Sequence, residues 1–418
     1  MTRNILQTSL DQIKNNWSIL LILSALFLFS TKALFNIPLT IMAILGAYRL
    51  VKNPALLKVP QIQLSYLLFA CLWVPMLFSL VDAEEIFRSS KTTFLYIHFL
   101  FSCIFMVDEL RKKEILKKII PGIFFMMTFF CLDAMLQFFT GKNLFGYPYS
   151  PPLLGGMFYP KNTLAHFLAL LSPVYFEYMR RHKNNYWMYA CVVLYLCVLL
   201  LGGKRSAWIM FLGGGVLYAA CLIFISKTTE YKKILVPAIL IIFVISALSL
   251  SYPPLKKRLT VTSGLFSGNY ETINKATAKR LPIWETGLVI IKSHWLNGVG
   301  ARNFRHVYAD FASADNYYIS DGRSGPTHPH LTVLEVLIET GSIGLIGYLL
   351  FWLILAKYAR LFLLSKNMPG MCWLISTMLA TMPYNTHLAF YGSYWASALW
   401  WVIPFFIVYA RHEDVLDS

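Results

Sequence analysis

The chain has 418 residues, of which 57% are hydrophobic and 14% charged, and its formal net charge is +17. A soluble protein of this length carries charge on about a quarter of its residues. The apolar residues also come in blocks of roughly 17 to 24, which is long enough to cross a bilayer. Composition therefore excludes one large soluble domain and predicts an all-α polytopic membrane protein.

The seven cysteines all fall inside apolar blocks and form no disulfide framework. The first apolar block continues without a small-residue cleavage site, so we expect no cleaved signal peptide. We predict about twelve transmembrane helices. In chain order they are centred near residues 24, 42, 71, 99, 128, 170, 194, 216, 242, 343, 378 and 401.

Lysine and arginine gather in alternate connections of this predicted bundle, such as "DELRKKEILKK" and "MRRHKNN". The positive-inside rule then places both termini in the cytoplasm. We expect one membrane-embedded domain with three parts. Residues 1–251 hold helices one to nine, residues 252–327 form a long periplasmic loop, and residues 328–418 hold helices ten to twelve.

Polar residues near the outer ends of the early spans are candidates for binding substrate. Arg88 and Lys91 open span four in "IFRSSKTTF", and Lys161, Asn162 and His166 lie in "FYPKNTLAHF". Each of them could contact sugar or phosphate. The alternative for each is a polar anchor at the membrane interface.

Two charges interrupt spans seven and eight in "LLLGGKRSAWIMF". A charge at membrane depth is costly and is functional by default. Snorkelling to the headgroups is the alternative, and we expect it for Lys204. Arg205 is instead interpreted as a functional residue.

The long loop holds ten Lys or Arg residues against five Asp or Glu. A basic outer surface suits an anionic lipid or glycolipid, and nucleic acid is not expected as a partner there. We predict an irregular start over 252–271, an amphipathic helix over 275–294 and a second helix near 301–313.

Arg280 lies at the start of the predicted amphipathic helix, where a lipid diphosphate would meet the interface. Its alternative is a solvated cation in the first turn. An apolar face is expected to lie on the membrane or on the bundle. The residues of that face are Ile283, Trp284, Leu288 and Ile291.

The loop ends in "SGPTHPHLTVLEVLIETGSIG". Pro329 discourages helix at the residue before it, so His330 lies at the entrance of span ten. Glu335 and Glu339 are four residues apart and share one face of that span. His330 has the alternative of an interfacial residue, and His328 that of a simple loop residue.

Three patterns together resemble a known family. They are an arginine in a tight outer turn, "R-x-x-x-W…G-V-G-x-x-N-F" over residues 280–304, and "H…L-E-x-L-x-E-T-G-x-x-G" over residues 330–344. The chain resembles the O-antigen ligase and polymerase superfamily, and most of all the O-antigen ligases of lipopolysaccharide assembly. The resemblance implies a glycosyltransferase C-like fold, and it implies that Arg205, Arg280 and His330 are the functional residues.

One departure from the family pattern concerns the histidines. Leu331 and Thr332 stand where many members have asparagine and often a second histidine, whereas His328 lies two residues before His330. Our interpretation assigns the catalytic role to His330 and a substrate-binding role to His328.

The resemblance implies transfer of O-antigen glycan from undecaprenyl diphosphate to a sugar hydroxyl of lipid A–core, at the periplasmic face of the bacterial inner membrane. An arginine guanidinium donates two parallel hydrogen bonds to phosphate oxygens, and a histidine can accept a proton near neutral pH. The outer acidic residues form no metal-type cluster, so we expect no metal or other cofactor and inversion at the anomeric centre.

Several alternatives stay open at this point. His330 could orient the diphosphate rather than act as a base. The activity could be that of an O-antigen polymerase or of a protein O-oligosaccharyltransferase. From a different class, the chain could be a polysaccharide or lipid transporter. We find no internal sequence repeat, which weighs against the transporter.

Overall fold

The computed structural model describes residues 16–31, 33–182, 187–226, 251–320, 323, 325–385 and 388–410. A helix over Asn16–Leu28 comes first. The membrane-type helices that follow are α2 (Asn36–Lys52), α3 (Pro60–Phe78), α4 (Ile86–Leu110), α5 (Lys113–Thr140), α6 (Leu164–Arg181), α7 (Trp187–Leu201), α8 (Arg205–Ser226), α14 (Thr332–Leu364), α15 (Met368–Ala380) and α16 (Ser393–Tyr409).

Each predicted span centre within these described ranges falls inside a helix, and the centre near residue 242 lies outside them. Five of the described helices are long and apolar enough to cross a membrane, namely α3, α4, α5, α8 as far as Ile225, and α14. Shorter apolar helices are residues 16–28, α7, α15 and α16. The polytopic all-helical class is confirmed, and the count of twelve stays a prediction.

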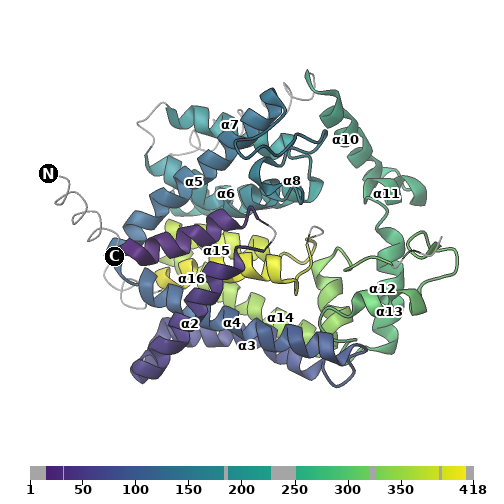
Figure 1. The fold of residues 1–418 in the computed structure, drawn as a ribbon, viewed down its shortest axis with the longest axis horizontal. Helices are drawn as coiled ribbons and strands as arrows, with labels where there is room; N and C mark the ends of the chain where they lie inside the picture. The colour runs from purple at the N-terminus through teal and green to yellow at the C-terminus, as the bar shows by residue number, and fades with distance from the viewer. Residues whose placement is uncertain are drawn as a thin grey trace.

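The helices pack around the C-terminal pair. Helices α15 and α16 lie together at the centre, with α6 and α8 on one side and α2, α3 and α4 on the other (Figure 1). Trp373 and Phe405 stack with ring centroids 4.1 Å apart, and Trp401 packs on Phe405. Large aromatic rings bury much area per residue, so this pair of helices anchors the bundle.

Between α8 and α14, the described residues form four helices that make a column along one end of the bundle (Figure 1). They are α10 (Pro253–Ser263), α11 (Tyr270–Ala276), α12 (Leu281–Ser293) and α13 (Phe304–Phe311). The predicted irregular start is wrong, because Pro253 and Pro254 occupy the first turn of α10, where a missing N–H has no effect. Helix α13 confirms the predicted second helix.

The single helix predicted over 275–294 is also wrong. Ala278 and Lys279 have positive φ angles of 61° and 62°, so the chain turns between α11 and α12. Pro282 in the first turn then starts α12 afresh. The break leaves Arg280 at the N-terminal boundary of α12, as predicted.

The apolar face of α12 packs on α14 rather than on lipid. Ile283 and Ile290 are buried in one cluster with Leu334 and Ile338 of α14. Leu288 was predicted to belong to this face, but its side chain is 56% exposed. The contact stripe centres on Gly287, whose missing side chain lets Leu334 and Ile338 approach, and Leu288 points away from that stripe.

A backbone junction joins the turn after α12 to a kink in α14. Gly341 breaks the helix with φ 63° and ψ −160°. The N–H of Val299 donates to the carbonyl of Ile338 (2.9 Å), and the N–H of Ser342 donates to the carbonyl of Trp295 (2.8 Å). A Cβ on Gly341 would lie 2.1 Å from the Leu296 carbonyl oxygen. Only glycine therefore permits this close approach.

Replacing Gly341 with alanine should destabilise the protein strongly. The conformation is one that only glycine adopts readily, and strain of this kind costs on the order of 1–3 kcal/mol before the clash with Leu296 is counted. Thermal unfolding of the purified protein in detergent measures the effect. Gly215→Ala is the control, because a Cβ there meets open space. Equal melting temperatures for the two variants would contradict the role of the junction.

Candidate active site

A first cationic group gathers where α10, α11 and α12 meet the α7–α8 turn. It consists of Lys204, Arg205, Arg258 and Arg280. The Arg258 Nη1 donates to the carbonyl of Gly203 (2.6 Å), and the Arg205 Nη1 donates to the carbonyl of Ala276. These two contacts fasten α10 and α11 to the turn that carries Lys204 and Arg205. Lys204, expected to snorkel away, instead belongs to the group.

The members of the first cationic group are half-buried and act on one another. Burial, together with the charge of Arg205, lowers the pKa of Arg280 to about 10. Burial also lowers the pKa of Lys204, with the charges of Arg258 and Arg280 adding to the effect. In the described part of the chain, none of the group forms an ion pair with a carboxylate.

Removing a cation from water without giving it a carboxylate partner raises the free energy of the folded protein. The arginines nevertheless remain protonated at neutral pH, because guanidinium holds its proton tightly. The arrangement therefore concentrates positive charge, and it favours an anionic ligand at this end of the bundle.

His166 extends the first cationic group onto α6. Its Nε2 lies 2.8 Å from the Ser206 Oγ on α8, and the charges of Lys204 and Arg280 act on its ring. The two neighbouring candidates make other contacts. Lys161 lies over the ring of Tyr394, with Nζ 4.2 Å from the ring centre.

Asn162 is buried and holds the loop before α6. It has a positive φ of 49°, and its side chain fills the space beside Gly155. Its backbone N–H donates to the carbonyl of Phe158 (2.7 Å). These contacts position the start of α6, and therefore His166, in the bundle.

The rings of the two histidines before α14 are in contact, tilted 46° to each other. The ring centroids of His328 and His330 are 3.8 Å apart. The indole N–H of Trp284 donates to the carbonyl of Pro329 (3.1 Å), which ties this turn to the first turn of α12, next to Arg280. His330 has a positive φ of 54°, a strained conformation of the kind that clusters at functional sites.

His328 is not a simple loop residue, since only 8% of its surface is exposed. Burial lowers the pKa of His328 to about 2, and the charges of His330, Arg302, Arg280 and Arg305 contribute to this shift. His328 is therefore neutral at physiological pH. The same charges show that His328 lies among the arginines of both the α12 start and the α13 start.

Glu335 and Glu339 point from α14 into the turn before α13. Both side chains are buried. The backbone N–H of Arg302 donates to the Glu339 Oε2 (2.7 Å), and the Arg302 Nη1 lies 4.0 Å from the Glu335 Oε1. The Glu335 Oε1 also accepts the N–H of Tyr391 (3.2 Å). The two glutamates share one face, as predicted, and they anchor the turn that positions Arg302.

A second cationic group lies next to this turn. It consists of Arg88 in the first turn of α4, Arg302, and Arg305 in α13. Burial lowers the pKa of Arg305, and the charges of Arg302 and Arg88 lower it further. Lys91, one helical turn after Arg88, is exposed, and nothing in the described residues joins it to either group.

The predicted residues Arg205, Arg280, His166, His328 and His330 thus come together at one end of the bundle. Sequence reasoning missed the cations that complete the two groups, namely Lys204, Arg258, Arg302 and Arg305. The spacing of Arg302 and Arg305 across the start of a helix was a visible signal. Nothing in the sequence signalled Arg258, which lies within a run of basic residues.

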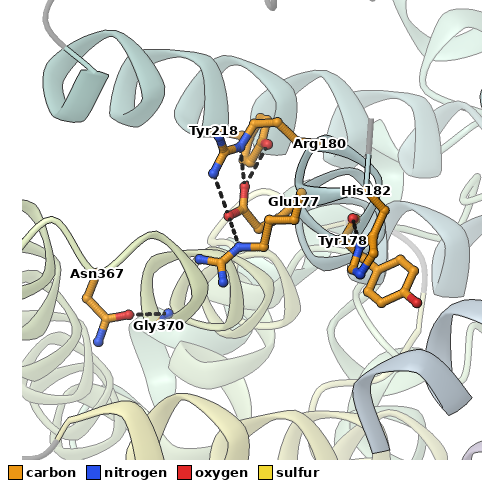
Figure 2. A network of polar contacts seen from close by, with 8 residues as sticks. Glu177, Tyr178, Arg180, His182, Tyr218, Asn367 and Gly370 are labelled. Atoms are coloured by element: carbon orange, nitrogen blue, oxygen red, sulfur yellow. Dashed lines mark hydrogen bonds and ion pairs between the residues drawn. The ribbon is translucent and has the colours of Figure 1, made fainter. Parts of the chain in front are cut away.

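The remaining intramembrane acids have structural partners. Glu177, at the end of α6, accepts hydrogen bonds from Arg180 (2.7 and 2.8 Å) and from the Tyr218 hydroxyl (3.1 Å), as Figure 2 shows. Asp133 on α5 accepts the side-chain amide of Asn143 (3.1 Å) and the N–H of Leu144. Both carboxylates stabilise local structure.

The sequence is similar to one known protein family and to curated relatives. Residues 190–349 match the family described as O-antigen ligase. A Rickettsia conorii protein named "Putative polysaccharide ligase" is 25% identical over 232 residues, and a Rickettsia felis protein of the same name is 24% identical over 235 residues. Each match covers 54% of this chain and 53% of the relative, so the chain spans about half the length of the curated relatives it matches.

The matched region contains the first cationic group, both histidines and the turn that carries Arg302 and Arg305. Arg88 and His166 lie before it. Over residues 190–349 the chain is therefore similar to the O-antigen ligase family, in agreement with the resemblance predicted from the sequence.

Proposed function

We propose that this protein transfers O-antigen glycan from undecaprenyl diphosphate to a sugar hydroxyl of lipid A–core, at the periplasmic face of the bacterial inner membrane. The observation that carries the proposal is the first cationic group. Its half-buried cations lack carboxylate partners among the described residues and lie beside two imidazoles. A diphosphate supplies the missing negative charge.

The arginines act on the leaving group. As the bond between the anomeric carbon and the diphosphate oxygen breaks, negative charge develops on that oxygen. Arg205 and Arg280 each offer two N–H donors in a planar fork that matches phosphate oxygens. Because these side chains are half-buried, their attraction for the developing charge is stronger than in water.

His330 acts on the acceptor. Its imidazole takes the proton of the acceptor hydroxyl while the hydroxyl oxygen forms the new bond to the anomeric carbon. Attack opposite the diphosphate inverts that centre. His328 stays neutral, and the contact between its ring and that of His330 holds the reactive ring in place. The alternative for His330 is that it orients the diphosphate as a cation.

Three other activities share parts of this proposal. An O-antigen polymerase would use the same donor with a different acceptor, and a protein O-oligosaccharyltransferase would use a protein hydroxyl. A transporter would need charges along a path across the bilayer. Glu177 and Asp133 have structural partners, and the candidate cations gather at one end of the bundle, which supports a transferase.

Deleting the gene tests the function directly. Lipopolysaccharide gels of the deletion strain should lose every rung of the O-antigen ladder while lipid-linked polymer is still made. A single capped repeat would instead identify a polymerase. An unchanged ladder, with glycan missing from proteins, would identify a protein glycosyltransferase.

Transfer by the purified protein should not require a divalent metal, since we assign charge stabilisation at the diphosphate to arginines. We expect the rate in excess chelator to stay within about twofold of the untreated rate, well short of the tenfold change that about 1.4 kcal/mol represents. The assay compares chelator-treated protein with protein supplied with magnesium. Strict dependence on added magnesium would overturn the metal-free mechanism.

A further inference from the structure

The second cationic group brings together residues that are far apart in the sequence. The Ser89 Oγ donates to the carbonyl of Ala301 (3.0 Å), a contact between residues 212 positions apart. The N–H of Glu84 donates to the carbonyl of Val299 (3.2 Å). These contacts dock the start of α4 on the turn before α13, so Arg88 reaches Arg302 and Arg305.

The guanidinium groups of the second cationic group have unused donors. The Nε atoms of Arg88 and Arg305 and the Nη1 of Arg302 are buried and have no hydrogen-bond partner. Buried N–H donors without a hydrogen-bond partner are rare in folded proteins, so we expect a bound ligand to supply the acceptor atoms. The two nearby carboxylates offset the three positive charges only in part. Glu335 forms a long ion pair with the Arg302 Nη1 (4.0 Å), and Glu339 accepts the backbone N–H of Arg302 through Oε2, while its Oε1 has no hydrogen-bond partner.

Both cationic groups act on the histidine pair. The charge of Arg205 acts on Arg280, whereas the charges of Arg88 and Arg302 act on Arg305. The charges of Arg280, Arg302 and Arg305 all act on His328, which therefore lies near both groups. Glycan transfer needs two substrates that meet at one base, so two cationic groups near one imidazole pair match a donor and an acceptor.

We propose that the second cationic group binds a phosphate group of the acceptor lipid, separately from the donor diphosphate at the first cationic group. This inference rests on the proposed function. Three buried N–H donors from three arginines match the several oxygens of one phosphate better than the two of a carboxylate. The phosphate belongs to the lipid headgroup, and free phosphate is the alternative source.

The test measures binding to the full-length protein in lipid nanodiscs. The probes are fluorescently labelled lipid A–core and the same lipid after enzymatic removal of its phosphates. We expect the intact protein to bind the phosphorylated lipid at least about tenfold more tightly, since hydrogen bonds to charged groups are strong. Arg88→Gln and Arg305→Gln should erase that preference and leave donor binding unchanged.

Controls separate recognition from folding. Arg305→Lys should restore part of the preference, and Lys292→Gln, an exposed side chain at the end of α12, should keep all of it. Inorganic phosphate at a concentration equal to that of the lipid should displace no bound acceptor. Displacement would assign the group to free phosphate and overturn the acceptor assignment.

The binding assay and the glycan-transfer assay test the two proposals separately. Equal binding of both lipids by the intact protein would overturn the inference even if transfer is normal. Discrimination for phosphate without any glycan transfer would support the second cationic group as a phosphate site and overturn the proposed function alone.

Discussion

His330→Ala should reduce glycan transfer by about 10² to 10⁴ while the protein still inserts and folds, because the acceptor hydroxyl loses its base. The rate is measured with purified protein, lipid-linked donor and lipid A–core. His182→Ala is the matched control, since this exposed histidine follows α6 and contacts Tyr178 near the Glu177 network (Figure 2), at the opposite end of α6 from His166. Near-normal transfer by His330→Ala would remove His330 from the mechanism.

The same variant distinguishes the two roles considered for His330. Loss of a base lowers kcat and leaves the donor KM unchanged, because the proton moves only in the transition state. Loss of a group that orients the diphosphate raises the donor KM. A raised donor KM with kcat retained would therefore favour the cationic role.

His328 is the internal control for the pH dependence. Burial and the neighbouring cations lower the pKa of His328 far below its usual value, so His328 stays a neutral imidazole throughout the usual assay range. Any loss of rate as the pH falls from 8 to 5 must then come from another group. We expect His328→Asn to keep the loss of rate at low pH that the wild type shows, although at a lower overall rate because the ring contact with His330 is lost. If the rate of His328→Asn no longer fell at low pH, His328 itself would be the group that gains a proton, and this expectation would be wrong.

Arg280→Lys should lose most activity, although it keeps a basic residue. The lysine ammonium is a point charge and cannot donate the two parallel hydrogen bonds with which a planar guanidinium binds phosphate oxygens. Hydrogen bonds to charged groups are worth about 1.5–3 kcal/mol, so we expect a rate on the order of 10- to 100-fold lower. Full activity in Arg280→Lys, with none in Arg280→Ala, would show that charge alone is needed.

The surroundings make lysine a poorer replacement still. Burial and the charges of Arg258 and Arg280 already lower the pKa of Lys204. A lysine at position 280 would meet the same burial and the charge of Arg205, so its own protonation would be less complete. Raising the assay pH should therefore reduce the activity of Arg280→Lys more than that of the wild type. Arg360→Lys, exposed on α14, is the control for the substitution itself.

The membrane class and the span positions were predictable because they depend on local composition. An apolar run of bilayer length forms a helix in lipid wherever it occurs, since every backbone group must be paired within it. The kink at Gly341 shows the limit of that rule. Its conformation depends on the carbonyl of Leu296, which belongs to a segment that periodicity cannot place.

Some residues of the candidate site were likewise predictable from the sequence, and others were revealed only by the structure. Arg280 and His330 were identified from short motifs, and the link from Trp284 to Pro329 joins them in space. Arg302 and Arg305 were passed over, because only the docking of the turn on Glu339 and on the start of α4 shows that their donors are buried and unpartnered.

The sequence by itself therefore determined a polytopic helical protein and a resemblance to the O-antigen ligase family, which singled out two arginines and a histidine as candidates. Tertiary structure alone decided how the cations group, that His328 is buried where charges from both groups act on it, and that α11 and α12 are separate helices. The physical reason is that hydrophobic length and helical period are local properties. Backbone hydrogen bonds and charge interactions between distant segments depend on how the whole chain packs.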